Sequence, residues 1–361
     1  MRQRAARHAA AILVIILLLF PLLAAGCGRD AKQAPLVAVL VAEDTREAKI
    51  AGLRLGLAAA GYREGTAVRY ATVSTHGSRD DLEQAAEELL DMKPAVVVAA
   101  GNIEAQRLKE ALSRRPGGEA DLPLVIMGAA STVESGLVAN LRHPGGNITG
   151  LDNGHAELTA KRLELLLTLL PDVKRVIALY DPSVAPGRHS LSIAVATAKR
   201  LHISLSPLSI ESSVELDQKL AALKPGDADA ILLLSTSLLE SAGPRLYETS
   251  IRTGIPTMGV NENDVEAGNF AAYGVSFEAQ GRQTARFVAK ILQGQAPGNL
   301  PVETPDNPEL VVNLDLARRL GLRVSPVGLA FARILPGPRQ VPQPGVSDSP
   351  TSAASAGEVG Q

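Results

Sequence analysis

This sequence has a single cysteine, no tryptophan and nearly equal numbers of basic and acidic residues. Of its 361 residues one is a cysteine, Cys27, so no disulfide can form within the chain and no later thiol is available for catalysis or metal binding. Tryptophan is missing, and aromatic residues make up 3% of the chain. Because 36 basic and 38 acidic residues are scattered along it, we expect no basic surface and no nucleic-acid partner.

The motifs of catalysis and cofactor binding are also missing. The six histidines show no metal-ligand spacing, and no G-x-S-x-G sequence marks a nucleophile. The glycine-rich stretch 145–150, GGNITG, lacks the lysine of a phosphate-binding loop and does not fit G-x-G-x-x-G. We therefore expect no cofactor, no metal and no catalysis, and an α/β enzyme is the less favoured alternative.

The N-terminus has the pattern of an export signal. An apolar run from Ala9 to Ala25 follows three arginines and ends in small residues. A membrane-spanning helix is the alternative, since the run is near the lower length limit for a span. Residues 23–27, LAAGC, resemble the bacterial lipoprotein cleavage box. We predict a signal peptide over 1–26, acylation of Cys27, a tether over 27–34, and a protein body held by lipid outside a bacterial membrane, in the periplasm or on the outer face of the cell membrane.

Short apolar runs alternate with amphipathic helices through the body of the chain. Continuous apolar runs predict strands of parallel sheets covered on both faces, and they occupy 36–42, 96–100, 124–127, 175–180, 230–235 and 256–260. Helical periodicity covers stretches between them, for example 80–92 and 156–170. The alternation predicts the α/β class, and its two sets, 35–142 and 172–262, predict two lobes.

Several stretches resemble one known family. PGGNITGL (144–151), VKRVIALYDPS (173–183), and the stretches 271–303 and 308–322 are similar to the extracellular ABC-transporter substrate-binding proteins of the tryptophan/tyrosine type. The resemblance covers roughly residues 35 to 335. It implies the type I periplasmic-binding fold, in which two Rossmann-like lobes with parallel sheets are joined by a three-segment hinge and close on a ligand between them.

The resemblance also implies a division of the chain. The N-lobe is expected from 35–148 plus about 275–305, and the C-lobe from 149–274 plus about 306–335. The first crossing is expected at the PGGN-x-TGL segment, with Gly145, Gly146 and Gly150 as hinge residues, and the others near 269–276 and 303–310. The remaining residues, 337–361, are rich in Pro and Ser, and we predict a disordered tail there.

Candidate ligand contacts come from the loops after the strands, because ligands bind at the carboxyl ends of such sheets. Three of these loops have the spacing of a helix capping box and predict an anion site at converging helix N-termini: Asp44-x-x-Glu47, Ser131-x-x-Glu134 and Ser237-x-x-Glu240. These hydroxyls can equally serve only as helix caps. The candidates for a ligand carboxylate are Ser131, Thr132, Ser235 and Thr236, and those for an ammonium group are Asp181 and Asn153, then Asn261 and Glu262. Tyr180 and Tyr273 are candidates for an aromatic wall. Asp152 is expected with Asn153 at the floor of the cleft, and Asp44 and Asn102 are expected in loops that reach the cleft.

Two of these loops depart from the family pattern. The loop after 124–127 is Gly-Ala-Ala-Ser-Thr, where family members have Gly-Asp-Pro, and the loop after 96–100 is Gly-Asn instead of Gly-Thr. Both changes leave the identity of the ligand open.

The function that the resemblance implies is capture without chemistry. A small molecule, either an amino acid or a related small carboxylate, is bound between the lobes of a monomer and delivered to an ABC permease with its ATPase. A lipoprotein that senses the ligand and signals, without transport, is the alternative.

Overall fold

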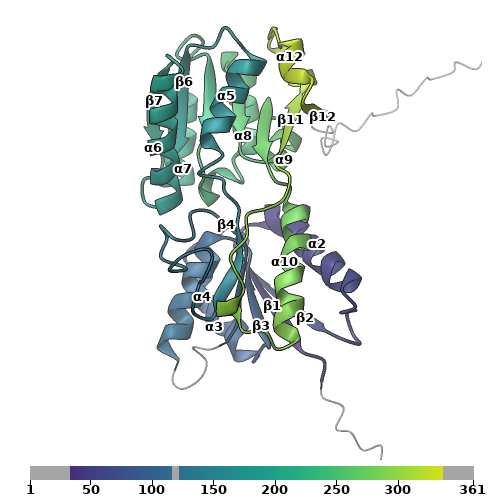
Figure 1. Cartoon of the computed structure of the whole chain (residues 1–361). Helices are drawn as coiled ribbons and strands as arrows, with labels where there is room; N and C mark the ends of the chain where they lie inside the picture. Colours follow the sequence, from purple (N-terminus) through teal and green to yellow (C-terminus); the bar gives the residue numbers. More distant parts are fainter. Residues whose placement is uncertain (1–32, 116–121, 336–361) are drawn as a thin grey trace, which may run out of the picture.

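The computed structural model describes residues 33–115 and 122–335. The predicted signal peptide, the acylation site Cys27, most of the tether and the predicted disordered tail lie outside these residues. Two α/β lobes lie one above the other (Figure 1). The predicted fold class is confirmed.

The N-lobe is built on a five-stranded parallel sheet in the order β2-β1-β3-β4-β5. Its strands are β1 (Leu36–Val41), β2 (Arg69–Ser74), β3 (Val96–Ala99), β4 (Leu124–Ala129) and β5 (Ile148–Asp152). Helices α3 (Leu82–Asp91) and α4 (Asn102–Arg114) pack on one face, through residues such as Leu89 and Leu108. Helices α2 (Glu47–Ala59) and α10 (Phe277–Leu292) cover the other face, through residues such as Leu53 and Val288.

Helices α2 and α10 lie unusually close together. A Cβ atom on Gly52 would come within 2.1 Å of the Glu278 carbonyl oxygen, and one on Gly281 within 2.0 Å of the Lys49 carbonyl oxygen. Glycine on both helices therefore lets the two backbones touch. This contact ties a late segment of the chain to the first lobe.

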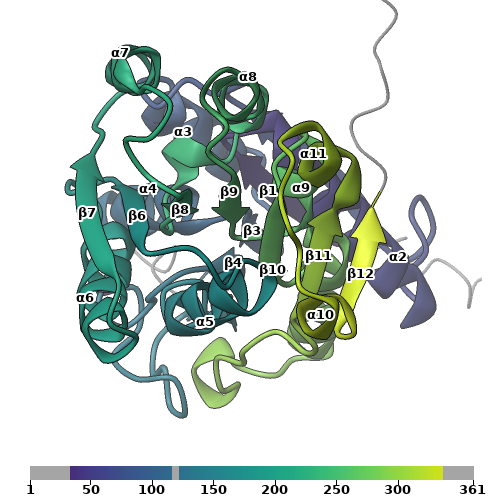
Figure 2. The ribbon, with the colours of Figure 1, turned by 90° about the horizontal axis from the view of Figure 1, so that it is seen from above.

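The C-lobe contains a seven-stranded sheet in the order β12-β11-β10-β9-β8-β6-β7, in which only the β10–β11 pair is antiparallel. Its strands are β6 (Arg175–Tyr180), β7 (Ser204–Ser209), β8 (Ala230–Leu233), β9 (Thr257–Gly259), β10 (Ala271–Gly274), β11 (Glu309–Asn313) and β12 (Ala332–Leu335). Figure 2 shows these strands between α5 (Thr159–Leu169) and α6 (Ala185–Arg200) on one side and α7 (Ser213–Ala222) and α8 (Gly243–Thr253) on the other. Shorter helices α9 (Glu262–Glu266), α11 (Leu314–Arg319) and α12 (Pro326–Leu329) complete the lobe.

Every apolar run predicted as a strand forms one, as β1, β3, β4, β6, β8 and β9. The two predicted helices correspond to α3 and α5. Strands β2 and β7 were missed because they lie at sheet edges and are only half-buried, so neither carries a continuous apolar run.

Three segments cross between the lobes, and the first lies later than the sequence predicts. Strand β5 pairs with β4 from Ile148 to Asp152, so the expected boundary after Ile148 falls inside a strand of the N-lobe sheet. The first crossing follows Asp152, the second lies between β10 and α10, and the third precedes β11.

This placement moves two predicted hinge glycines away from the hinge. Gly145, at φ +77°, and Gly146 precede β5, at the opposite end of the strand from the crossing, so neither connects the lobes. Gly150 lies within β5 at φ +132°, where a Cβ atom would come within 2.2 Å of the Ile126 carbonyl oxygen. Its role is close packing of β5 on β4.

Candidate functional site

Loops from the carboxyl ends of both sheets meet at a small cavity between the lobes. Its N-lobe lining follows β1, β3, β4 and β5, and its C-lobe lining follows β6, β8 and β9. The cavity has a volume of about 40 Å³, which is room for about one water molecule. Ligand pockets usually have about 300–1,000 Å³. An amino acid therefore enters this cavity only if the lobes move apart or a side chain leaves its centre.

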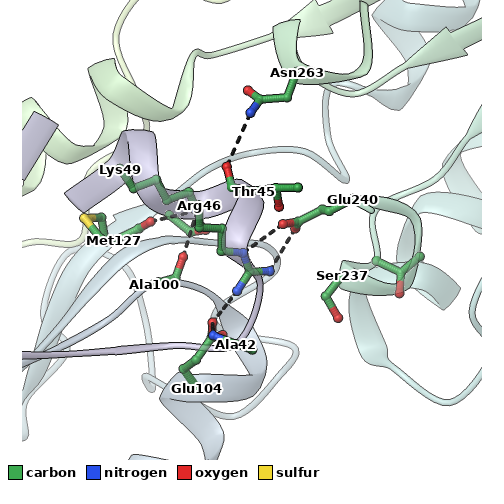
Figure 3. Close-up of polar contacts among 12 residues, drawn as sticks. Ala42, Thr45, Arg46, Lys49, Ala100, Glu104, Met127, Ser237, Glu240 and Asn263 are labelled. Atoms are coloured by element: carbon green, nitrogen blue, oxygen red, sulfur yellow. Dashed lines mark hydrogen bonds and ion pairs between the residues drawn. The ribbon is translucent and has the colours of Figure 1, made fainter. Parts of the chain in front are cut away.

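The side chain at that centre is Arg46, which follows β1 in the short helical turn η2 (Asp44–Arg46). Its Nε and Nη2 atoms donate to the two carboxylate oxygens of Glu240 at 2.8 and 2.9 Å, and Nη1 donates to Glu104 (Figure 3). Glu240 belongs to the C-lobe and Glu104 to the first turn of α4 in the N-lobe, so the guanidinium links the lobes. Although burial opposes the charges, the carboxylates raise the pKa of Arg46, and Arg46 lowers the pKa of Glu240.

The N-lobe residues around Arg46 hold it in place. Glu104 is fully buried and also accepts a hydrogen bond from the Ala42 backbone N–H at 2.9 Å. A Cβ atom on Gly101 would lie 2.4 Å from Arg46 Nη1, so a glycine is required at this position for the guanidinium to fit. Arg46 is therefore positioned by its own lobe, independently of Glu240.

Lys49 lies one helical turn after Arg46 and is also buried. Its Nζ atom donates to the carbonyl oxygens of Ala100, Met127 and Gly128, at 2.8, 3.0 and 3.3 Å, and lies 4.7 Å from the centre of the Phe277 ring. Burial, reinforced by the nearby charge of Arg46, lowers the pKa of Lys49 to about 7. Its ammonium group connects the ends of β3 and β4 to α2.

Two further contacts join the lobes at the margin of the cavity. Arg79 donates to Ser237 Oγ at 3.0 Å and lies 3.8 Å from the Asp181 carboxylate. Asn263 Nδ2 donates to the Thr45 carbonyl oxygen at 3.4 Å. The lobes are thus closed on each other by side chains at several points.

The hinge side of the cavity is formed by Asn153 and His155 after β5. His155 is buried, its Nε2 atom has no hydrogen-bond partner among the described residues, and burial holds its pKa well below the usual value. Arg162 of α5 donates to the carbonyl oxygens of His155, Tyr273 and Val260 at 2.6, 2.8 and 3.3 Å. The first crossing is thereby attached to the ends of β9 and β10.

Some of the predicted ligand contacts line the cavity, namely Asn102, Asn153, Ser235 and Thr236. Others lie close to it but have partners within the protein. Thr132 donates to Asp152 through its backbone N–H and its hydroxyl, at 2.8 and 2.7 Å. Asp181 accepts from the Ser183 backbone N–H at 2.9 Å and from the Thr236 hydroxyl at 3.3 Å. As ligand contacts, all of these residues stay predictions.

The remaining candidates lie elsewhere. Asp44 is 61% exposed and pairs with His76 at 2.9 Å. Tyr180 and Tyr273 pack against the core of the C-lobe. Asn261 caps α9, and Glu262 pairs with Arg333 at 2.6 Å, outside the cavity.

The expected capping boxes do not form. Ser131 is followed by a turn, has φ 52°, and its hydroxyl has no partner among the described residues. Asp44 lies inside η2, which has no side-chain cap, and Thr236, not Ser237, caps the turn η4 (Ser237–Leu239). Glu240 is turned toward Arg46 instead of capping that turn, because the buried guanidinium is a stronger partner.

The charged centre of the cavity was missed by the sequence analysis. Lys49, Leu53 and Leu57 share one buried face of α2, so a lysine on that face was a readable signal. Arg46 and Glu104 gave no comparable signal, since their contact joins residues far apart in the sequence.

The family model for "ABC transporter substrate binding protein" matches residues 36–332. The chain belongs to this family. Its members are binding proteins and not enzymes, and the predicted resemblance is confirmed. No group of three metal-binding side chains occurs among the described residues, and no helix in the described part of the chain has the length and apolar character to cross a membrane.

Three relatives are close in sequence or structure. A "tyrosine-binding protein" of Clostridioides difficile is 24% identical over 263 residues, which are 73% of each chain. A solved structure of a conserved domain protein from Vibrio cholerae has a TM-score of 0.77 and 27% identity, covering 84% of this chain and 99% of that one. The ABC domain from Streptococcus pneumoniae, solved in complex with L-Trp, has a TM-score of 0.76 and 22% identity, with the same coverage.

Proposed function

We propose that this substrate-binding protein captures an amino acid or a related small carboxylate between its lobes and delivers it to an ABC permease. The observation that carries the proposal is the ring of loops from both lobes around one cavity, with Arg46 and Glu240 joined across it. A ligand that contacts both lobes favours their closed arrangement, and the closed form is what a permease recognises.

The lining favours a small or polar amino acid over an aromatic one. Apart from His155, the side chains that line the cavity are aliphatic, polar or charged, and no phenylalanine or tyrosine is among them. Tyrosine and L-Trp, named for two relatives, belong in the same panel of test compounds, because they carry the same α-ammonium and α-carboxylate groups as every other amino acid.

Export and anchoring complete the proposal. The family works outside the cytoplasm, and acylation of Cys27 would keep the protein at the membrane of its permease, with the residues before β1 as a short tether. Mass spectrometry of the protein purified from membranes tests this: an N-terminal acylated cysteine is expected, and an unmodified Met1 or Gly28 terminus contradicts it.

Binding is tested on the chain from Gly28 to Gln361. Native mass spectrometry is expected to show a small molecule that co-purifies with it, and one of the twenty amino acids is expected to raise the melting temperature. A ligand at about 100 times its Kd stabilises the folded protein by about 2.7 kcal/mol, and it is recovered intact. No bound molecule and no shift with any amino acid would overturn the proposal.

Transport is distinguished from sensing in a deletion strain. Transport predicts that the strain loses uptake of the labelled ligand, and that uptake returns with the wild-type gene. Loss of a transcriptional or behavioural response with normal uptake would favour the sensing alternative.

A further inference from the structure

A second pocket lies at the hinge, and all three crossings contribute to it. Its volume is about 420 Å³, within the usual range of ligand pockets. Residues 152–154 of the first crossing, Val275 of the second and residues of 304–308 in the third line this hinge pocket. The rest of the lining comes from the loop after β4 and from the segment that leads into α5. Because the lobes rotate about the crossings, a molecule in the hinge pocket would contact the part of the protein that moves.

The hinge pocket is separate from the cleft between the lobes. The small cavity described above and a larger one of about 430 Å³ beside it share Asn102, Ile103 and Val184, so these two together form the cleft. The hinge pocket shares only Asn153 with the small cavity and only Glu134 with the larger one. The first crossing therefore lies between the hinge pocket and the small cavity.

The lining of the hinge pocket combines apolar side chains with charge of one sign. Its ionisable residues are three carboxylates, Glu134, Asp152 and Glu157, and no lysine, arginine or histidine is among the lining residues. Half of the lining is apolar, namely Val133, Leu141, Leu158, Val275, Pro305 and Pro308. This composition suits a molecule with an apolar body and one cationic group.

Asp152 is a buried charge of the hinge pocket that has no cation beside it. The side chain is 6% exposed, and its carboxylate accepts from the Thr132 backbone N–H, the Thr132 hydroxyl and the Gly154 backbone N–H, at 2.8, 2.7 and 3.0 Å. These donors are neutral and fix the carboxylate in place, and no cationic side chain pairs with it in the described part of the chain. A buried carboxylate without a cationic partner is unfavourable, so a cation in the hinge pocket would stabilise it.

Glu134 and Glu157 add negative charge at the exposed side of the hinge pocket. Burial raises the pKa of Glu157, and the charges of Asp152 and Glu134 raise it further, so the three carboxylates are close enough to repel one another. His189 of α6, outside the lining, lies 3.5 Å from Glu157 and partly offsets this repulsion. A cationic ligand would reduce it further.

We infer that the hinge pocket is a second binding site, which takes a small amine with an apolar body. Its ammonium group lies against Asp152, with Glu157 nearby, and its apolar part lies among Leu141, Leu158 and Val275. Because all three crossings line the pocket, a bound amine favours the arrangement of the lobes in which the pocket has this shape, and so holds the molecule closed. The site goes beyond the proposed function and does not depend on what binds in the cleft.

Calorimetry with 2-phenylethylamine, on the chain from Gly28 to Gln361, tests the chemistry of the site. Its neutral and anionic analogues, 2-phenylethanol and 3-phenylpropanoate, have nearly the same apolar body. The amine is expected to bind at least about 10-fold more tightly than either analogue, because only the amine brings a charged donor to a buried carboxylate. Equal binding of the three compounds, or no binding of the amine, would contradict an amine site.

Hydrogen exchange locates the bound amine. The slowing of exchange on addition of 2-phenylethylamine is expected to be larger in 152–158 and 304–308, which contain hinge-pocket residues, than in 101–103 and 235–237, which line the cleft. An equal or larger slowing in the cleft loops would mean that the amine binds in the cleft, and the hinge site would be wrong.

Two variants change the hinge pocket at positions that do not line the cleft. Thr304→Trp, at an exposed position of the third crossing, is expected to fill the pocket and to abolish amine binding. Glu157→Gln is expected to weaken amine binding by about 3-fold and to leave 2-phenylethanol unaffected. Glu248→Gln, which removes an exposed carboxylate of α8, is the matched control and is expected to change neither.

Melting temperatures show whether each variant folds. If Thr304→Trp does not fold, Glu157→Gln and the exchange pattern decide. Amine binding that is unchanged in the folded pocket variants, or weakened equally by the control, would overturn the hinge site.

Discussion

Gly150 lies in β5 opposite Ile126 of β4, where the two backbones leave no room for a side chain. Its φ is +132°, and a Cβ atom added to it would come within 2.2 Å of the Ile126 carbonyl oxygen. Gly146, just before the same strand, has nothing within 4 Å of its Cβ position and no positive φ.

The two glycines should therefore respond differently to alanine. Gly150→Ala is expected to lower the free energy of unfolding by about 2–4 kcal/mol, through strain and displacement of β5. Gly146→Ala is the matched control, and its effect is expected to stay within about 0.5 kcal/mol. Urea unfolding followed by circular dichroism measures both, and equal losses would contradict the packing described for β5.

Because of Lys49, the free energy of unfolding is expected to change with pH between about 7 and 10.5. Burial lowers its folded-state pKa to about 7, below the unfolded value of 10.5, so between these values the unfolded chain binds more protons than the folded protein. The free energy of unfolding therefore rises with pH in this window, by up to about 1.4 kcal/mol for each pH unit.

Lys49→Met removes this titration and conserves most of the apolar volume. As pH rises from 7 to 10, the unfolding free energy of the wild-type protein is expected to increase relative to that of the variant. Groups that titrate in both proteins cancel in this difference. Parallel pH profiles would show that Lys49 does not titrate in that range.

Helix α5 carries the arginine that fixes the first crossing to the C-lobe sheet. Arg162 is fully buried, and burial lowers its pKa to about 10, so it is still charged at neutral pH. Its three carbonyl partners lie in the crossing itself and at the ends of β9 and β10. The three bonds come from three different nitrogen atoms of the guanidinium group, and the single nitrogen of a lysine side chain cannot occupy all three positions.

Arg162→Lys is therefore expected to destabilise the protein by about 2 kcal/mol or more, because buried carbonyl groups lose a charged donor. Lys161→Arg, an exchange at the exposed neighbouring position, is the control and is expected to be close to neutral. Thermal and urea unfolding measure both variants. A lysine variant as stable as the control would mean that water replaces the lost bonds.

The strands that are buried on both faces could be predicted from the sequence. Strands β1, β3 and β4 consist almost entirely of buried apolar residues, and this pattern is visible without a structure. Strand β5 contains Gly150 and follows two other glycines, so it resembled a linker. Its pairing with β4 is a long-range contact that no local pattern contains.

The candidate site was predictable in place but not in its central chemistry. The rule that loops at carboxyl strand ends form the site led to Asn102, Ser235 and Thr236, which line the cavity. Arg46 and Glu240 are separated by most of the chain, and their contact depends on how the lobes close. Pairings of this kind follow from the tertiary arrangement and have no signature in spacing.

Side chains at several points hold the two lobes of the molecule closed, and the Arg46–Glu240 pair is the central one. Glu240→Ala is expected to open the molecule, because Arg46 would otherwise remain buried with one partner fewer and gains hydration when the lobes part. Small-angle X-ray scattering is expected to show a larger radius of gyration than for the wild type. Glu248→Ala is the control, and an unchanged radius for Glu240→Ala would show that the other contacts suffice for closure.

Neither lobe is a continuous piece of chain, and this bears on the order in which the protein can be built during synthesis. The N-lobe sheet ends with β5, but the groove beside Gly52 on α2 stays open until α10 has been made. The C-lobe sheet likewise stays incomplete until β11 and β12 have been made. Both lobes are therefore completed only after α10, β11 and β12 have been made, and a premature stop before α10 leaves no finished lobe.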